Sequence, residues 1–371
     1  MSTIPRFFAA VERVIGLGTM AAAVAVAPLE AQRAERRIVV VTLDGMRWQE
    51  VFGGAARGLI TGDSGGVRDT ALTLGRYWRD GPMERREALL PFLWRTVARE
   101  GQIWGDSTMG STVRVTNGKR FSYPGYNELF AGAPDDRIDS NDKIPNPNRT
   151  VVEALAALPR YRGRIELFGS WDVFPFIFNV ARSHLPLNGD GLPFPHPTEA
   201  QRLANAMTDA LPSLWSGARL DAITMIAARQ ALELRRPKVL VVLLGETDEW
   251  AHDRRYDQYL DAAHRADRFI GELWTRLQQL PEYRGKTSLV LATDHGRGAG
   301  RDWSDHGRDV PAAERIWMAV MGPEVPALGP RRDANAAQSQ LAATIASLLG
   351  ERWTVGQPLA LSREGGGKSG N

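Results

Sequence analysis

The stretches VLVVLLGETDEWAHDRRYDQYL (residues 239–260) and TSLVLATDHGRGAGRDWSDHG (residues 287–307) decide the fold. Each begins with an apolar, β-branched run that is typical of a strand buried on both faces of a parallel sheet. A third run of this kind, RIVVVTL, occupies residues 37–43. Amphipathic helical patterns lie between such runs. Strands that alternate with helices predict an α/β fold, with a mostly parallel central sheet and helices on both faces.

Carboxylates and imidazoles follow directly after these three runs. In an open α/β sheet, ligands bind outside the carboxyl ends of the strands. Aspartate and histidine are common donors for zinc-like ions. Taken singly, each aspartate would suit a turn or a helix cap equally well. Together they predict a metal site at one edge of the sheet, and its candidate ligands are Asp44, Asp248, His252, Asp294, His295 and His306.

The remaining patterns supply the other layers of the fold. Thr150 and Glu153 form a capping-box pattern at the start of an expected helix. A segment rich in proline, glycine and aromatic residues begins at residue 171 and indicates an insertion over one edge of the sheet. We expect helices over residues 150–158, 198–215, 219–235 and 334–349, a strand over residues 164–170, and an edge strand over residues 315–322.

The N-terminus resembles a secretory signal. A basic start precedes the uncharged run VIGLGTMAAAVAVAPL, and Ala31 lies near a suitable cleavage point. The run is too short to favour a stable membrane span, although an uncleaved anchor is the alternative. We therefore expect a periplasmic or secreted protein. Its parts would be a leader over residues 1–31, a catalytic domain over 32–362 with an insertion at about 171–236, and a disordered tail over 363–371.

Composition narrows the classes of partner. The formal net charge is only +3, and basic and acidic residues are interspersed. Charge therefore gives no reason to expect a nucleic-acid-binding surface. The chain has no cysteine, which excludes a disulfide framework and a lipid-anchored cysteine. Its stability must come from the core, which a hydrophobic content of 43% can supply, and from any bound metal.

Ser122 is the candidate nucleophile. It lies in KRFSYPGYNELFAG (residues 119–132), before a Tyr-Pro-Gly turn and a short stretch that can form a helix. A serine at such a turn holds its hydroxyl beside a helix N-terminus, where backbone N–H groups can bind an anion. Coordination to a metal ion would deprotonate the hydroxyl and make it nucleophilic. An ordinary capping or turn serine is the alternative interpretation.

In their order along the chain, these motifs resemble the alkaline phosphatase superfamily, in particular its nucleotide pyrophosphatase/phosphodiesterase-like branch. That branch has a strand-end Asp, a Thr or Ser nucleophile before an aromatic-Pro pair, then Asp-x-x-x-His, Asp-His-Gly and a later His. The corresponding residues here are Asp44, Ser122 in Ser-Tyr-Pro, Asp248 with His252, Asp294-His295-Gly296, and His306. The resemblance spans about residues 37–307 and implies an alkaline-phosphatase-like fold.

The resemblance implies a phosphoric ester hydrolase, a phosphatase or phosphodiesterase, that acts on small-molecule phosphate esters with two divalent metal ions. One ion would be held by Asp248, His252 and His306. The other would be held by Asp44, Asp294 and His295, with Ser122 bound to it. Ser122 would form a phosphoseryl intermediate. Zinc suits the mixed His/Asp donors, and manganese or iron fits the same ligands.

Other features bear on the reaction. Asn141 resembles the asparagine that follows the nucleophile in the diesterase branch and would contact the phosphoryl oxygens. Three basic residues are alternatives for that role: Lys119, Arg120 and Lys143. Tyr126 stands where sulfatases carry the arginine of their nucleophile motif, which disfavours a modified sulfatase. Hydrolysis of sulfate or phosphonate esters at the same site remains a rival function, and a catalytically silent metal-binding domain is a rival of another class.

Overall fold

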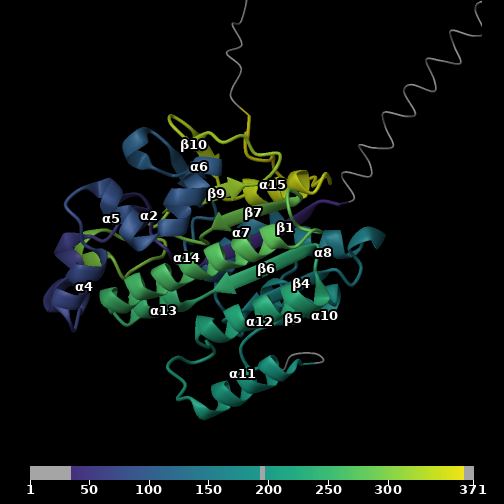
Figure 1. Cartoon of the computed structure of the whole chain (residues 1–371), viewed down its shortest axis with the longest axis horizontal. Coiled ribbons are helices and arrows are strands. Elements are labelled where there is room, and N and C mark those ends of the chain that lie inside the picture. Colours follow the sequence, from purple (N-terminus) through teal and green to yellow (C-terminus); the bar gives the residue numbers. More distant parts are fainter. Residues whose placement is uncertain (1–34, 193–196, 363–371) are drawn as a thin grey trace, which may run out of the picture.

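The computed structural model describes residues 35–192 and 197–362, and its centre is an eight-stranded sheet (Figure 1). In the order β10-β2-β9-β7-β1-β6-β4-β5, every strand except β9 runs in the same direction. The predicted mostly parallel sheet is therefore confirmed. Its strands are β1 (Arg37–Leu43), β2 (Gly101–Trp104), β4 (Ile165–Gly169), β5 (Leu187–Asn188), β6 (Val239–Leu244), β7 (Thr287–Ala292), β9 (Met318–Met321) and β10 (Gly329–Pro330).

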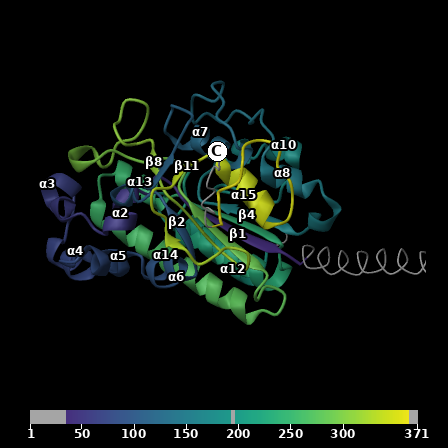
Figure 2. The ribbon, with the colours of Figure 1, turned by 90° about the horizontal axis from the view of Figure 1, so that it is seen from above.

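Helices cover both faces of this sheet. Apolar side chains of the central strand β1 point alternately to the two faces, so both faces must be buried. In β1, Val39 and Val41 pack into the core on one face, while Ile38 and Val40 pack into the core on the other. The first face is covered by α12 (Asp221–Arg235) and α14 (Tyr256–Gln279). The second is covered by α7 (Ser122–Ala131), α8 (Val151–Ala156) and α15 (Gln340–Leu348). Figure 2 shows the two sets of helices on opposite sides of the strands.

Short helices fill the chain between β1 and β2, which the sequence patterns did not resolve. They are α2 (Trp48–Gly53), a 3-10 helix (Arg57–Leu59), α3 (Gly62–Gly65), α4 (Thr70–Tyr77), α5 (Pro82–Leu89), a π-helical turn (Leu93–Val97) and α6 (Ala98–Glu100). Several of them, such as α2, α4 and α5, form a separate group at one end of the molecule (Figure 1). This group packs beside α14 and covers one side of the hydrophobic core that lies between the sheet and the helices α12 and α14.

Three predicted elements were wrong in place or extent. The helix expected over residues 198–215 ends at Ala210, because the chain becomes extended at Leu211. The strand expected at the sheet edge over residues 315–322 is the interior, antiparallel β9, because the short strands β2 and β10 extend the sheet beyond it. The helix expected over residues 334–349 begins only at Gln340, because Asn335–Ala337 form β11. That strand joins β3 (Thr112–Arg114) and β8 (Arg315–Ile316) in a second, three-stranded sheet.

The chain after β4 forms further short elements beside the sheet. α9 (Phe174–Ile177) and α10 (Val180–Ser183) precede β5, and α11 (Glu199–Ala210) lies against α12, away from the strands (Figure 1). The division into a catalytic domain with an insertion stays a prediction. The expected leader and tail lie outside the described residues, and within residues 35–192 and 197–362 no helix has the length and apolarity needed to cross a membrane.

Candidate metal centre

The carboxyl ends of three neighbouring parallel strands place the candidate ligands at one edge of the sheet. Asp44 follows β1 directly, and Asp294 with His295 follows β7 after one intervening residue. After β6 the chain enters α13 (Glu246–His252), which carries Asp248 and His252 four residues apart. Four residues make about one helical turn, so both side chains of α13 can reach the same point.

Two glycines allow the backbone to approach closely at this edge. Gly45 has a φ of +57°, and a Cβ there would lie 2.6 Å from Oδ1 of Asp248. Gly125 lies in the first turns of α7, and a Cβ there would lie 2.3 Å from the carbonyl oxygen of Asp294. The start of α7, where Ser122 stands, is therefore held directly against the end of β7.

His295 lies at the centre of the ligand cluster. Its Nε2 is 3.3 Å from Oδ1 of Asp44, 3.4 Å from Oδ1 of Asp248 and 3.5 Å from Oδ2 of Asp294. Its Nδ1 lies 2.9 Å from the carbonyl oxygen of Gly296, so Nδ1–H donates there and Nε2 keeps its lone pair. Oδ2 of Asp294 is buried and has no hydrogen-bond partner. Buried acceptors that face one another in this way can hold a cation between them.

A second group of donors lies beside the first. Nε2 of His252 is 3.0 Å from Oδ2 of Asp248 and 3.0 Å from Nε2 of His306. Nδ1 of His306 lies 3.2 Å from the carbonyl oxygen of Arg120, so its Nε2 is also an acceptor. Burial, and then the nearby His295, lower the pKa of His306 to about 2. The imidazole of His306 is therefore neutral, which is the form that binds a metal.

The three carboxylates have different electrostatic environments. Burial, and then the charge of Asp248, raise the pKa of Asp44 well above its usual value. Burial, and then the charge of Asp44, do the same to the pKa of Asp294. Burial opposes ionisation of Asp248 too, but the Arg297 guanidinium and His252 outweigh it and hold its pKa well below the usual value. The cluster thus carries more acidic groups than the protein's own cations neutralise.

Ser122 faces this cluster. Its Oγ lies 3.4 Å from Oδ1 of Asp44 and 3.4 Å from Nε2 of His295. Phe121, not Ser122, occupies the N-cap position of α7, and no side chain caps that helix end. The hydroxyl of Ser122 is therefore not used as an ordinary helix cap. It lines a cavity of about 200 Å³ together with Asp44 and His252.

Asn141 lines the same cavity. Its Oδ1 accepts a hydrogen bond of 3.0 Å from the backbone N–H of Tyr123, one residue after the candidate nucleophile. Because this backbone donor requires an acceptor, the orientation of the amide is fixed and Nδ2 remains a donor. The three basic alternatives do not line the cavity: Lys119, Arg120 and Lys143 lie near the carboxylates of Asp136, Glu314 and Asp172 respectively.

Arg297 and Glu249 are two charged residues of the site that sequence reasoning missed. Arg297 is fully buried, and its Nη2 donates to both the carboxylate and the carbonyl oxygen of Asp248. Its Nη1 donates to the carbonyl oxygen of Ser304, two residues before His306. Glu249 lines the cavity, and burial, followed by the charge of Asp248, raises its pKa to about 7. Only their positions beside Asp248 and Asp294-His295-Gly296 could have suggested either residue.

Comparisons with known proteins identify the family of this chain. A family model described as type I phosphodiesterase / nucleotide pyrophosphatase matches residues 76–358. A search of curated proteins found no match. Among solved structures, alkaline phosphatase PafA is 11% identical with a TM-score of 0.58, over 87% of this chain and 98% of that chain. A putative sulfatase from Bacteroides thetaiotaomicron is 10% identical with a TM-score of 0.52, over 86% of this chain and 72% of that chain.

At such low identities the solved structures show a shared fold, and the family model carries the assignment. Its match covers most of the described residues and includes Ser122, Asp248, His252 and the segment from Asp294 to His306. The chain therefore belongs to the type I phosphodiesterase / nucleotide pyrophosphatase family and is a hydrolase of phosphate esters with the alkaline-phosphatase fold.

Proposed function

We propose that this chain hydrolyses phosphate esters with two divalent metal ions and with Ser122 as the nucleophile, through a phosphoseryl intermediate. One observation carries the proposal. The Oγ of Ser122 lies 3.4 Å from both Asp44 and His295, beside the unpartnered carboxylate oxygen of Asp294. A serine hydroxyl that lies this close to candidate metal ligands is well placed to be activated by a cation.

Two ligand sets would hold the ions: Asp248, His252 and His306 for one, and Asp44, Asp294 and His295 for the other. The ligand atoms of Asp44, Asp294 and His295 lie within 4.8 Å of one another, which supports the second set. For the first set, Nε2 of His252 is 3.0 Å from both Asp248 and His306, and His295 also lies within 4.8 Å of Asp248 and His306, between the two sets. When bound, such ions polarise phosphoryl oxygens and lower the pKa of a coordinated hydroxyl. Zinc fits imidazole and carboxylate donors, and manganese or iron would fit the same set.

The protein's own groups would then perform the substitution at phosphorus. Ser122 gives up its proton to solvent, and its Oγ forms a bond to phosphorus as the bond to the leaving alkoxide breaks; the alkoxide takes a proton from solvent and leaves as an alcohol. Nδ2 of Asn141 and the backbone N–H of Ser122, at the start of α7, would donate to the non-bridging oxygens. A water molecule next attacks the phosphoseryl group, which releases phosphate from a monoester or a phosphomonoester from a diester, and restores the serine.

Replacement of the nucleophile tests this mechanism. We expect Ser122→Ala to lower kcat on an aryl phosphate by at least about a thousandfold, because no other group forms the intermediate. Metal content and the thermal midpoint should stay close to those of the wild type. Ser347→Ala, an exposed serine of α15, is the matched control and should keep full activity. Mass spectrometry of a rapidly quenched reaction should find phosphate on Ser122.

The same experiment separates the rival functions. Unchanged turnover by Ser122→Ala would remove Ser122 from its role. A catalytically silent domain would show bound metal and no turnover of any ester by the wild type. A parallel panel of aryl phosphate monoesters, phosphate diesters, phosphonates and sulfates distinguishes phosphate hydrolysis from the sulfate or phosphonate alternative. Export to the periplasm or the medium remains part of the proposal and is tested by fractionating cells that express the full chain.

A further inference from the structure

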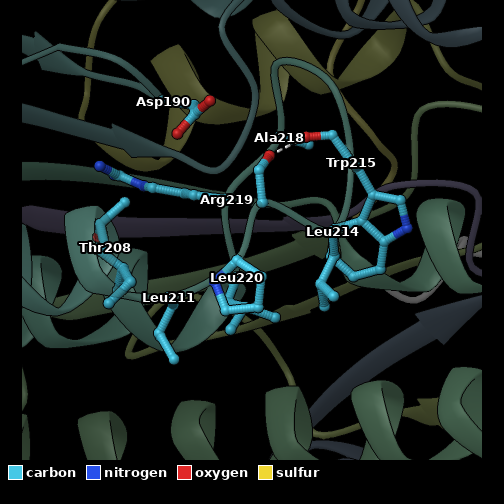
Figure 3. Close-up of a pocket in the computed structure, with 11 residues that line it drawn as sticks. Asp190, Thr208, Leu211, Leu214, Trp215, Ala218, Arg219 and Leu220 are labelled. Carbon is cyan, nitrogen blue, oxygen red and sulfur yellow. Dashed lines mark hydrogen bonds between the residues drawn. The ribbon is translucent and has the colours of Figure 1, made fainter.

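A second pocket lies close to the metal centre, between the end of α11 and the start of α12 (Figure 3). Its volume is about 70 Å³. Most of its lining is apolar and comes from Leu211, Leu214, Trp215, Leu220 and Ile223. Asp190, Thr208, Ser213 and Arg219 add polar groups, and Figure 3 shows Asp190 on the opposite side of the pocket from Leu211 and Leu220.

This pocket adjoins the cavity that contains Ser122. Ala218 lines both spaces, and its backbone pairs with that of Trp171, another wall of the cavity. Trp215 joins the pocket to α13, the helix that carries two candidate ligands. Its ring packs edge-on against Trp250 with centroids 4.8 Å apart, and its Nε1 donates to Asp253 at 2.9 Å. The two spaces therefore adjoin at Ala218, which forms part of the wall of each.

The apolar lining continues onto the surface of α11. Leu211 and Leu214 line the pocket while 44% and 51% of their surfaces remain exposed. Leu203 and Met207 are 62% and 44% exposed, and their four-residue spacing places them with Leu211 on one face of the helix. An exposed row of large apolar side chains is unusual unless something apolar covers it.

The size of the pocket decides what can enter it. An apolar cavity that holds a benzene ring has a volume of about 150 Å³, so a pocket of about 70 Å³ favours a narrower group. A slender chain of methylene groups fits, and it can leave the pocket along the row of Leu211, Met207 and Leu203. We propose that this pocket and row bind the hydrocarbon chain of an amphiphilic phosphate ester whose phosphate lies at Ser122. The inference rests on the proposed function and narrows its substrate class.

A chain-length series tests the inference. The substrates are alkyl 4-nitrophenyl phosphates and alkyl phosphate monoesters, from methyl to octyl. Burial of each methylene group should raise kcat/KM by up to about fourfold over the first few carbons. Leu214→Asp should bring the octyl-to-methyl ratio toward one. Leu234→Asp is the matched control, because Leu234 is 60% exposed on α12 and does not line the pocket, so it should keep the wild-type ratio.

Binding provides a readout that does not depend on turnover. Calorimetry with methyl and octyl phosphonate, which cannot lose their alkyl groups by ester hydrolysis, should show the same preference for the longer chain and its loss in Leu214→Asp. Equal efficiency across the ester series overturns the inference but leaves the proposed function in place. Absence of all turnover, with the octyl preference still present in binding, refutes only the proposed function. If Leu214→Asp converts a dimer to a monomer without changing the ratio, the row contacts a second copy and the inference is wrong.

Discussion

Asp294 shows how a single residue can oppose folding without metal and favour it with metal. In the metal-free protein its carboxylate is buried near that of Asp44, and burial, followed by the charge of Asp44, raises its pKa. We expect Asp294→Asn to raise the thermal midpoint in the presence of a chelator, because the repulsion is gone. In excess zinc the variant should instead melt below the wild type, because one ligand is lost.

Thermal scans with and without zinc, together with metal quantification, check this crossover. Asp136→Asn is the control, because the side chain of Asp136 is 98% exposed and should behave as the wild type under both conditions. Full metal occupancy in Asp294→Asn would contradict its place among the ligands.

Arg297 links two ligands of the same proposed ion. One end of its guanidinium contacts Asp248, and the other contacts the carbonyl oxygen of Ser304, close to His306. We expect Arg297→Met to weaken metal binding at that ion by about 10- to 100-fold, because the ligands lose their fixed orientation. Competition against a chromogenic chelator measures the two affinities separately. Arg297→Lys should recover part of the loss, and the exposed Arg301→Met should cause none.

The positions of the candidate metal ligands could be predicted and that of Arg297 could not, for a physical reason. Asp44, Asp248 and Asp294 each follow an apolar run, so local sequence alone places them at the edge of a sheet. The burial of Arg297 depends on its contact with Asp248, which is 49 residues away. In sequence, an arginine among glycines reads as a solvated loop residue.

The first turns of α7 depend on the absence of a side chain at Gly125. A Cβ there would lie 2.3 Å from the carbonyl oxygen of Asp294, so Gly125→Ala must move α7 away from the end of β7. We expect kcat to fall by about tenfold or more, because small displacements of a catalytic group are costly. Gly75→Ala in α4 is the matched control, since a Cβ at that helical glycine meets nothing within 4 Å. Equal activity of the two variants would contradict the tight placement of Ser122.

Helices and strands were predictable where their signal is local. The hydroxyl of Thr150 accepts from the backbone N–H of Glu153, as the capping pattern predicted, but the carboxylate of Glu153 binds Arg182 instead of completing the box. Asn335–Ala337 illustrate the opposite case. A helical pattern covered them, yet pairing with β3, far away in the chain, makes them a strand. Such pairing can override the local propensity, and it cannot be recognised from the sequence of the segment alone.

At the scale of the whole molecule, alternation of strands and helices predicted the class of fold but not the order of its strands. The neighbours of β7 are β1 and β9, and the first of these is separated from it by most of the chain. The burial of the sheet on both faces could be predicted from the apolar runs, because the side chains of these strands contribute to the cores on both faces. The interior position of β9 depends on β2 and β10, whose two to four residues are too short to show a period.

The stability of the whole protein should couple metal to pH. Without metal, the pKa values of Asp44 and Asp294 are raised above their unfolded value. Their contribution to stability is therefore complete below the unfolded pKa, near 3.8, and is lost as pH rises through the folded values. With metal bound, both remain ionised ligands and this loss disappears. His306 is neutral both in the metal-free and in the metal-bound folded protein. Its titration in the unfolded chain therefore affects the stability of both forms equally and does not change the difference between them.

The increase in thermal midpoint on adding zinc should consequently grow from about pH 5.5 to about pH 8. Scans of the chelated and zinc-loaded protein at matched ionic strength measure it. Asp294→Asn should show a shallower dependence, because one of the two titrating groups is gone. A metal-induced increase that stays constant or shrinks as pH rises would mean that these buried carboxylates are not where the cations bind.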